Sequence, residues 1–215
     1  MKFNLLAWVS LSIVICNLYL LGTSRLPAMI RAVAVQGFLL SFLPLLLPNP
    51  AEPLHVVIMV VLSAAVKGIA IPYYLRRAIR GVSAVRDSNP SVGYTLSIAY
   101  GIFAAALSFY VLRKIPFSSV TVSPFHASTA IATAAIGLFL IVTRRNVVSQ
   151  VIGYLVFENA GFILAVSVAA FQPLFIEMGT LLDILVGVFI MVVAIRYVHS
   201  AHNSISIKPL ERLNR

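Results

Sequence analysis

The chain has 215 residues, a mean hydropathy of +1.01 and only 10% charged residues. Soluble domains carry about 25% charged residues, and disordered chains are poor in the apolar residues that make up 60% of this one. These values exclude both classes and predict an integral membrane protein. The net charge of +10 does not indicate nucleic-acid binding, because the basic residues fall at helix ends and not on one face.

Seven apolar segments follow one another along the chain, and each has about the 20 residues that a spanning helix needs. A transmembrane β-barrel would instead show short strands of alternating polarity. The sequence therefore predicts an all-α polytopic membrane helix bundle of about seven transmembrane helices. The segments cover residues 5–22, 28–47, 54–75, 92–112, 122–142, 147–170 and 174–195.

We expect three regions: four helices within residues 1–115, three helices within residues 116–200, and a cytoplasmic basic tail at residues 201–215. The second segment is the least regular, because it contains Arg31 and Pro44. Arg31 has to extend to an interface if that segment spans the membrane.

The lysines and arginines predict the orientation. Twelve lie on one side of the predicted membrane and three on the other, with Lys67 inside a helix. Because basic residues concentrate in cytoplasmic loops, we expect the N-terminus outside and the C-terminus in the cytoplasm, with the chain in a prokaryotic plasma membrane. The twelve are Arg25, Arg31, Arg76, Arg77, Arg80, Arg86, Arg144, Arg145, Arg196, Lys208, Arg212 and Arg215, and the three are Lys2, Arg113 and Lys114.

Four charged residues fall inside apolar segments: Lys67, Glu158, Glu177 and Asp183. Each costs about 2.5–3.5 kcal/mol at a helix centre, and such residues usually face a bundle interior and often form proton relays. Desolvation also brings the pKa values of buried carboxyl and amino groups toward neutrality. We therefore interpret the four as candidate proton-translocation residues. A structural ion pair between Lys67 and one carboxylate is the alternative.

Spacing places two of these acids at the same depth. Glu158 follows Arg145 by 13 residues, and Asp183 precedes Arg196 by 13 residues. At the rise of an α-helix, each acid then lies about 20 Å from a cytoplasmic-side arginine, near the middle of the membrane. Lys67 has a long side chain that can reach the same layer.

A polar stripe leads toward this layer. Gln150, Tyr154 and Glu158 are spaced i, i+4, i+8, which puts them on one helix face. Each can donate or accept a hydrogen bond, so the stripe is a candidate proton path from the cytoplasm. Glu177 lies closer to the outer end of the last segment.

Cys16 is the only cysteine. An iron–sulfur cluster takes about four protein ligands, and structural zinc sites also use several thiolates. We therefore expect no redox centre and no cofactor of the chain's own.

Short runs of residues in the last segments and around Lys67 form a pattern that is known from one protein family. They are Arg145-Asn146, Gln150, Gly153-Tyr154, Glu158-Asn159, Glu177-x-Gly179-x-x-x-Asp183, and Pro72 five residues after Lys67. With the length and helix count, they resemble the membrane subunit called hydrogenase-4 component E. The last three segments also resemble the small K-type subunit of respiratory complex I and the C-type subunit of multi-subunit cation/proton antiporters. The resemblance is strongest over residues 140–205.

This resemblance implies a non-catalytic subunit in the membrane arm of a complex I-like or group 4 nickel–iron hydrogenase-like assembly. Its implied partners are antiporter-like subunits and hydrogenase or dehydrogenase subunits, and its implied role is proton or sodium translocation coupled to their electron transfer. Asp183 matches an acid of the K-type subunit, whereas the second acid of that subunit falls on Leu155. Glu158 lies one turn further on and is the substitute, a departure that favours the hydrogenase-4 resemblance.

Two other classes remain open from the sequence. A stand-alone ion or solute transporter is possible, although no inverted repeat is evident and the helix count is odd. A haem- or quinone-binding anchor would need histidine pairs at matching depth inside helices, whereas His55 and His126 lie near the outer ends of segments. The electron donor, whether hydrogen, formate, carbon monoxide or quinol, is left open.

Overall fold

The computed structural model describes residues 2–46, 53–79, 90–114 and 124–168, and all elements in these ranges are helical. The seventh predicted segment and the basic tail lie outside these ranges. The helices are α1 (Lys2–Gly22), α2 (Leu26–Ser41), α3 (Leu43–Leu46), α4 (Pro53–Ala65), the π-helical turn η1 (Val66–Ala70), α5 (Ile71–Ile79), α6 (Tyr94–Lys114), α7 (Pro124–Thr143) and α8 (Val147–Val168).

These helices confirm the predicted all-α membrane bundle. Within the described ranges, five helical stretches are long and apolar enough to cross a membrane, and the apolar part of α1 at Ala7–Gly22 is somewhat shorter. Together, the five stretches and α1 correspond to the first six predicted segments. The five stretches are Leu26–Leu46, Val56–Arg77, Tyr94–Lys114, Phe125–Thr143 and Val147–Ala165.

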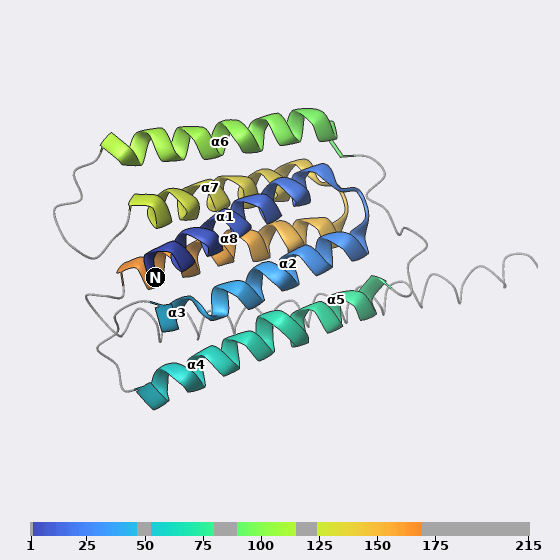
Figure 1. Cartoon of the computed structure of the whole chain (residues 1–215). Coiled ribbons are helices and arrows are strands. Elements are labelled where there is room, and N and C mark those ends of the chain that lie inside the picture. Colours follow the sequence, from blue (N-terminus) through green and yellow to red (C-terminus); the bar gives the residue numbers. More distant parts are fainter. Residues whose placement is uncertain (1, 47–52, 80–89, 115–123, 169–215) are drawn as a thin grey trace, which may run out of the picture.

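The helices lie side by side with their axes roughly aligned (Figure 1). The α6 helix forms one edge of the bundle, the continuous stretch α4–η1–α5 forms the other, and α1, α2, α7 and α8 lie between them. Short connections put the end of α1 beside the start of α2, and the end of α7 beside the start of α8.

One end of this bundle carries most of the described basic residues, and we call it the arginine-rich end. It holds Arg25 before α2, Arg76 and Arg77 in α5, and Arg144 and Arg145 between α7 and α8. The last turn of α6, with Arg113 and Lys114, lies at the opposite end. Arg31, one and a half turns into α2, is exposed, and its long side chain can extend toward the arginine-rich end.

Pro44 interrupts the second spanning segment. Proline has no N–H to donate, and its ring clashes with the carbonyl group four residues earlier, which is that of Leu40. The α2 helix ends at Ser41, and α3 resumes at Leu43 after a turn at Phe42.

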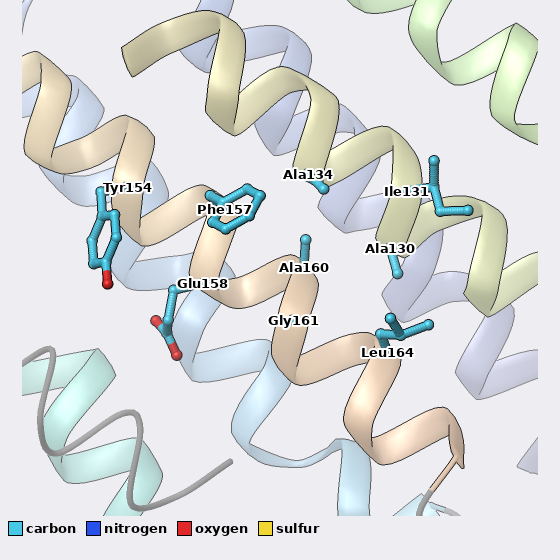
Figure 2. A pocket seen from close by; sticks show the side chains of 9 residues that line it. All are labelled: Ala130, Ile131, Ala134, Tyr154, Phe157, Glu158, Ala160, Gly161 and Leu164. Carbon is cyan, nitrogen blue, oxygen red and sulfur yellow. The ribbon is translucent and has the colours of Figure 1, made fainter. Parts of the chain in front are cut away.

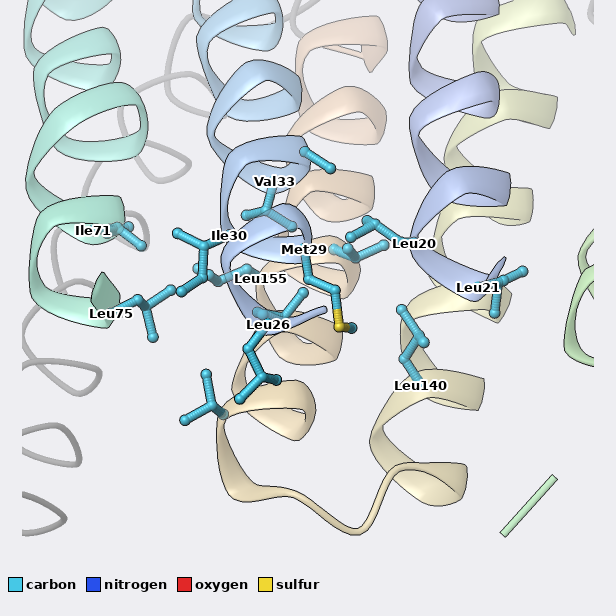
Figure 3. Packing of buried hydrophobic residues seen from close by; sticks show 14 of the residues in the cluster. Leu20, Leu21, Leu26, Met29, Ile30, Val33, Ile71, Leu75, Leu140 and Leu155 are labelled. Carbon is cyan, nitrogen blue, oxygen red and sulfur yellow. The ribbon is translucent and has the colours of Figure 1, made fainter. Parts of the chain in front are cut away.

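The main hydrophobic core joins helices from both expected regions. Figure 3 shows Leu20 of α1, Met29 of α2, Leu75 of α5, Leu140 of α7 and Leu155 of α8 converging on it. All five side chains are buried. This cluster therefore joins helices from both sides of the predicted division at residue 115, and the division itself remains a prediction.

Candidate functional site

The structure brings two of the predicted charged residues together inside the bundle. The ammonium nitrogen of Lys67 in η1 lies 2.9 Å from a carboxylate oxygen of Glu158 in α8, and only 3% of each side chain is exposed. Glu158 is the one acidic residue in the ranges that the structure describes. This buried ion pair joins the α4–η1–α5 edge to α8.

The π-helical turn that carries Lys67 follows from Pro72. Proline has no N–H, and its ring clashes with the carbonyl group four residues earlier, which is that of Gly68. The backbone responds with a wider turn, in which the N–H of Ile71 bonds to the carbonyl oxygen of Val66. Such π-turns inside α-helices occur frequently at functional sites.

Gly37 in α2 lets this turn come close. A Cβ atom built on Gly37 would lie 2.8 Å from the Cβ atom of Lys67 and 3.6 Å from its Cγ and Cδ atoms. Real side chains do not approach so closely, so only glycine fits. The aliphatic part of Lys67 therefore runs over the α2 backbone, and its ammonium group reaches α8.

Two glycines set the rotation of α8. A Cβ atom on Gly137 of α7 would lie 2.5 Å from the backbone nitrogen of Phe157, and one on Gly153 would lie 2.9 Å from that of Ile141. The two helices therefore touch through their backbones, as small residues permit in membrane bundles. This contact turns Gly153 and Phe157 toward α7 and leaves Glu158 on another face.

Further contacts hold the ammonium group of Lys67. Its nitrogen donates a hydrogen bond to Asn159 Oδ1 at 3.2 Å. It also lies 4.5 Å from the centre of the Phe162 ring, within the range of a cation–π interaction. Asn159, the polar neighbour of Glu158 in the sequence motif, thus belongs to the same site.

Tyr154 lies one helical turn from Glu158 on the side of the arginine-rich end. Figure 2 shows both side chains extending from the same side of α8, while Ala130 and Ile131 of α7 lie on the other. Tyr154 is partly exposed, at 38%. The structure thus places Tyr154 between the ion pair and the bundle end, as the spacing predicts.

Gln150 starts the stripe at the connection between α7 and α8. Its side-chain amide nitrogen donates a hydrogen bond to the carbonyl oxygen of Arg144 at 2.9 Å. Gln150 therefore also fixes the start of α8. Passage of protons along Gln150, Tyr154 and Glu158 remains a prediction.

An apolar groove of about 240 Å³ runs between α7 and α8 beside the site (Figure 2). Small and apolar side chains line it, so it offers few polar groups to a hydrophilic solute. Its lining consists of Ala130, Ile131, Ala134, Tyr154, Phe157, Glu158, Ala160, Gly161 and Leu164.

Asp183 and Glu177, the other two predicted acids, lie outside the described residues. Their depth and their place relative to Glu158 therefore remain predictions.

A second buried cation was missed, because Arg144 looks like an ordinary charge of a cytoplasmic loop. Only 1% of Arg144 is exposed. Its guanidinium nitrogen donates to the carbonyl oxygen of Leu21 at 2.7 Å, and the group lies 4.7 Å from the centre of the Tyr94 ring. Arg144 therefore ties the end of α1 and the start of α6 to the α7–α8 connection. Its neighbour Arg145 is exposed and marks the surface.

A line of hydrogen-bonded polar residues, the polar seam, joins α1 to α7, and the sequence analysis did not predict it. The Ser10 hydroxyl lies 2.8 Å from His126 Nδ1, and seven residues later Asn17 Nδ2 donates to Thr133 Oγ1 at 2.9 Å. Gln36 of α2 adds a bond to Asn17 at 3.0 Å. The matching seven-residue steps are those of packed parallel helices, and this periodicity was the available signal.

The arrangement at Lys67 supports one kind of chemistry in particular. Transfer of a proton from the ammonium group to the carboxylate turns a charged pair into a neutral pair, and the reverse step restores it. Neither step leaves an isolated charge in the bundle, where one would be costly. A buried lysine–glutamate pair can therefore pass a proton between two sides of the bundle.

No protein-family model matches the chain, and no solved structure matches it significantly. Over 180 residues it is 26% identical to Rv0085 of Mycobacterium tuberculosis, a protein described as uncharacterised, and the match covers 83% of this chain and 82% of the relative. Over 147 residues it is 22% identical to hydrogenase-4 component E of Escherichia coli K12, with 68% of each chain covered. The protein of that name from Shigella flexneri matches equally.

These relatives support the main resemblance found in the sequence, whereas the likeness to complex I and antiporter subunits remains a prediction. The chain is thus distantly similar, over two thirds of its length, to a membrane subunit named as a component of a hydrogenase.

Proposed function

We propose that the protein is a non-catalytic membrane subunit of a hydrogenase-like redox complex in a prokaryotic plasma membrane. In this proposal it moves protons through the bundle, coupled to electron transfer in its partner subunits. The similarity to hydrogenase-4 component E supports the kind of complex. The ion pair between Lys67 and Glu158 carries the proposal of proton movement.

The ion pair favours the proton over the sodium ion. A sodium site needs several oxygen ligands, which carboxylates and carbonyls supply. In this bundle the ammonium group of Lys67 lies against the carboxylate of Glu158 and also binds the side-chain oxygen of Asn159. A lysine at this place has no affinity for a cation, but it exchanges protons readily once its environment lowers the cost of the neutral form.

In the proposed route, protons enter at the arginine-rich end, along Gln150 and Tyr154, and reach Glu158. Lys67 releases its own proton toward the other end of the bundle and then takes the proton from Glu158. Asp183 and Glu177 are proposed as later or parallel sites. The expected partners are antiporter-like subunits and hydrogenase or dehydrogenase subunits.

Isolation of the native complex tests the class. An affinity tag on the chain should co-purify hydrogenase or dehydrogenase subunits from mild-detergent extracts, and mass spectrometry identifies them. Isolation as a monomer that transports a solute in liposomes would instead establish the stand-alone transporter.

Substitution of Glu158 tests proton movement. Glu158→Gln keeps the size and an amide oxygen that accepts from Lys67, but it does not titrate. We expect normal amounts of complex and strongly reduced proton uptake into inside-out membrane vesicles, per electron transferred from the donor of the purified complex. Gly161→Ala on the same helix is the control, since a Cβ atom there meets nothing within 4 Å, and it should pump as the wild type does. Wild-type proton uptake in Glu158→Gln would show that the pair is structural.

A further inference from the structure

The buried polar groups do not stop at Lys67. Ser63 of α4 precedes Lys67 by four residues, and its hydroxyl oxygen lies 3.3 Å from that of Ser41 in α2. Ser63 is 4% exposed and Ser41 is fully buried. Two hydroxyl groups in contact therefore follow the ion pair, on the side away from the arginine-rich end.

Both serines lie one helical turn beyond the closest approach of α2 and η1. That approach joins Gly37 to Lys67, and Ser41 and Ser63 are displaced from these two residues by four positions in the same direction. A displacement of four residues is about 6 Å along a helix. The hydroxyl pair thus extends the line from Tyr154 through Glu158 and Lys67 toward the other end of the bundle.

The hydrogen bonds of the pair leave its direction open. The Ser41 hydroxyl has two oxygens within reach as a donor, the carbonyl oxygen of Gly37 at 2.9 Å and the hydroxyl oxygen of Ser63 at 3.3 Å. Because a hydroxyl group rotates and both donates and accepts, either serine can donate to the other. The pair also lies where α2 is interrupted, since α2 ends at Ser41. Interrupted helices in membrane proteins occur where the backbone faces protein or a water-filled path.

We propose that Ser63 and Ser41 form the outward leg of the proton route, a role that rests on the proposed function of the Lys67–Glu158 pair. Lys67 gives a proton to the oxygen of Ser63, whose own proton passes to Ser41 and on toward the outer end. Each hydroxyl accepts one proton and releases one, so both end unchanged. Glu158 takes a proton from the side of Tyr154 in the same step, so the pair becomes neutral and no isolated charge is left in the bundle. The proton of Glu158 then passes to neutral Lys67, which restores the ion pair.

The seam between α1 and α7 is the competing route, and its geometry assigns it to packing. Gln36 extends from α2 to Asn17 of α1, whereas the neighbouring Gly37 faces Lys67. The seam and the ion pair therefore lie on different faces of α2. Thr133 also donates to the backbone of its own helix at Thr129, which ends the chain of side-chain hydrogen bonds there.

The test removes the two hydroxyls from the native complex. Ser41→Ala with Ser63→Ala should lower proton uptake per electron several-fold in inside-out vesicles, with normal amounts of complex. Ser108→Ala is the matched control, because Ser108 is equally buried and its hydroxyl donates only within α6, to Ala104 at 2.7 Å. This control should pump as the wild type does.

Comparison with Glu158→Gln separates the two proposals. If Glu158→Gln stops proton uptake while the double serine variant pumps normally, the outward leg is wrong and the ion-pair relay stands. If Glu158→Gln pumps normally, the relay itself is wrong, and the serine leg falls with it.

A labelling experiment covers the case in which the alanine variants fail to assemble. In a Cys16→Ala background, Ser63→Cys should react with a small cationic thiosulfonate added at the outer face, and the reaction should block proton uptake. Ser108→Cys should react much more slowly. Equal rates for the two cysteines would overturn the outward leg.

Discussion

At the scale of single residues, the ion pair has two properties that must be measured separately. A buried pair contributes little net stability, because desolvation of both charges offsets their attraction, whereas loss of one partner is strongly destabilising. The pair between Lys67 and Glu158 is therefore expected to add little to the free energy of unfolding, so the fold does not need it. Stability alone gives no reason for the pair, and the proposed proton exchange is the role to test.

A double-mutant cycle on this pair separates stability from transport. Lys67→Met and Glu158→Leu should each lower the free energy of unfolding by about 3–5 kcal/mol, because each leaves an unpaired buried charge. The double variant should recover most of that loss, yet it should not move protons. Unfolding midpoints of the purified protein in detergent and proton uptake into vesicles measure the two effects. Additive losses in the double variant would contradict the direct pairing of the two side chains.

Gly37 provides a second residue-scale prediction. Gly37→Ala places a methyl group 2.8 Å from Lys67 Cβ, so α2 and η1 must separate, at a cost of about 1–3 kcal/mol. The shift also pulls the ammonium group away from Glu158, and proton uptake should fall with stability. Gly161→Ala in α8 is the matched control, since a Cβ atom there meets nothing within 4 Å, and it should leave both unchanged. A stable, active Gly37→Ala variant would show that the close approach is unnecessary.

At the scale of helices, the ends of α1, α6 and α7 depend on Arg144. The last carbonyl groups of a helix have no partner within it, and a cation near them is favourable. Arg144 provides this for α1 through the carbonyl oxygen of Leu21. It also lies over the Tyr94 ring at the start of α6.

Arg144→Ala should therefore destabilise the bundle by about 1.5–3 kcal/mol, the range for a hydrogen bond to a charged group. Arg144→Lys should recover only part of this, because a lysine lacks the planar group that both donates and stacks. Arg145→Ala is the control: Arg145 is exposed, and its contact with Ser91 is a surface hydrogen bond of 3.3 Å. The unfolding midpoints of the variants in detergent measure these effects. Equal effects of the two alanine substitutions would refute the role given to Arg144.

The helices themselves were predictable from the sequence, because an apolar run of spanning length has few alternatives in a membrane. That the side chain of Lys67 can reach the layer of Glu158 also followed from residue counts, since the rise per residue is fixed. The sides on which the helices contact one another could not be predicted from the sequence. These sides depend on the π-helical turn before Pro72 and on backbone contacts at Gly37, Gly137 and Gly153, and these are properties of pairs of helices that one segment does not reveal.

At the scale of the whole molecule, the ion pair lies between two parts of the bundle that are distant in sequence. Lys67 belongs to the α4–η1–α5 edge, whereas Glu158 belongs to α8, and α2 with Gly37 passes between them. A small sliding of that edge relative to α2 and α8 would change the distance between the two charges. This arrangement suits a subunit whose proton site responds to a neighbouring subunit, as the proposed coupling requires.

The distribution of charge at the two ends predicts the orientation of the whole bundle. The sequence predicts twelve basic residues on one side of the membrane and three on the other, and cytoplasmic loops carry such an excess. Those of the twelve that the structure describes at a helix end lie at the arginine-rich end. The arginine-rich end is therefore expected in the cytoplasm. In a Cys16→Ala background, Lys114→Cys at the opposite end should react with an impermeant thiol reagent in intact cells.

Ser91→Cys is the matched position for this experiment, because Ser91 is also exposed but lies at the arginine-rich end, bonded to the carbonyl oxygen of Thr143 through its backbone. It should react only after the cells are permeabilised. The reverse pattern, with Ser91→Cys labelled in intact cells and Lys114→Cys protected, would invert the bundle. Protons would then enter the proposed route from outside at Tyr154 and leave toward the cytoplasm at Ser41, so the direction of transport depends on this single measurement.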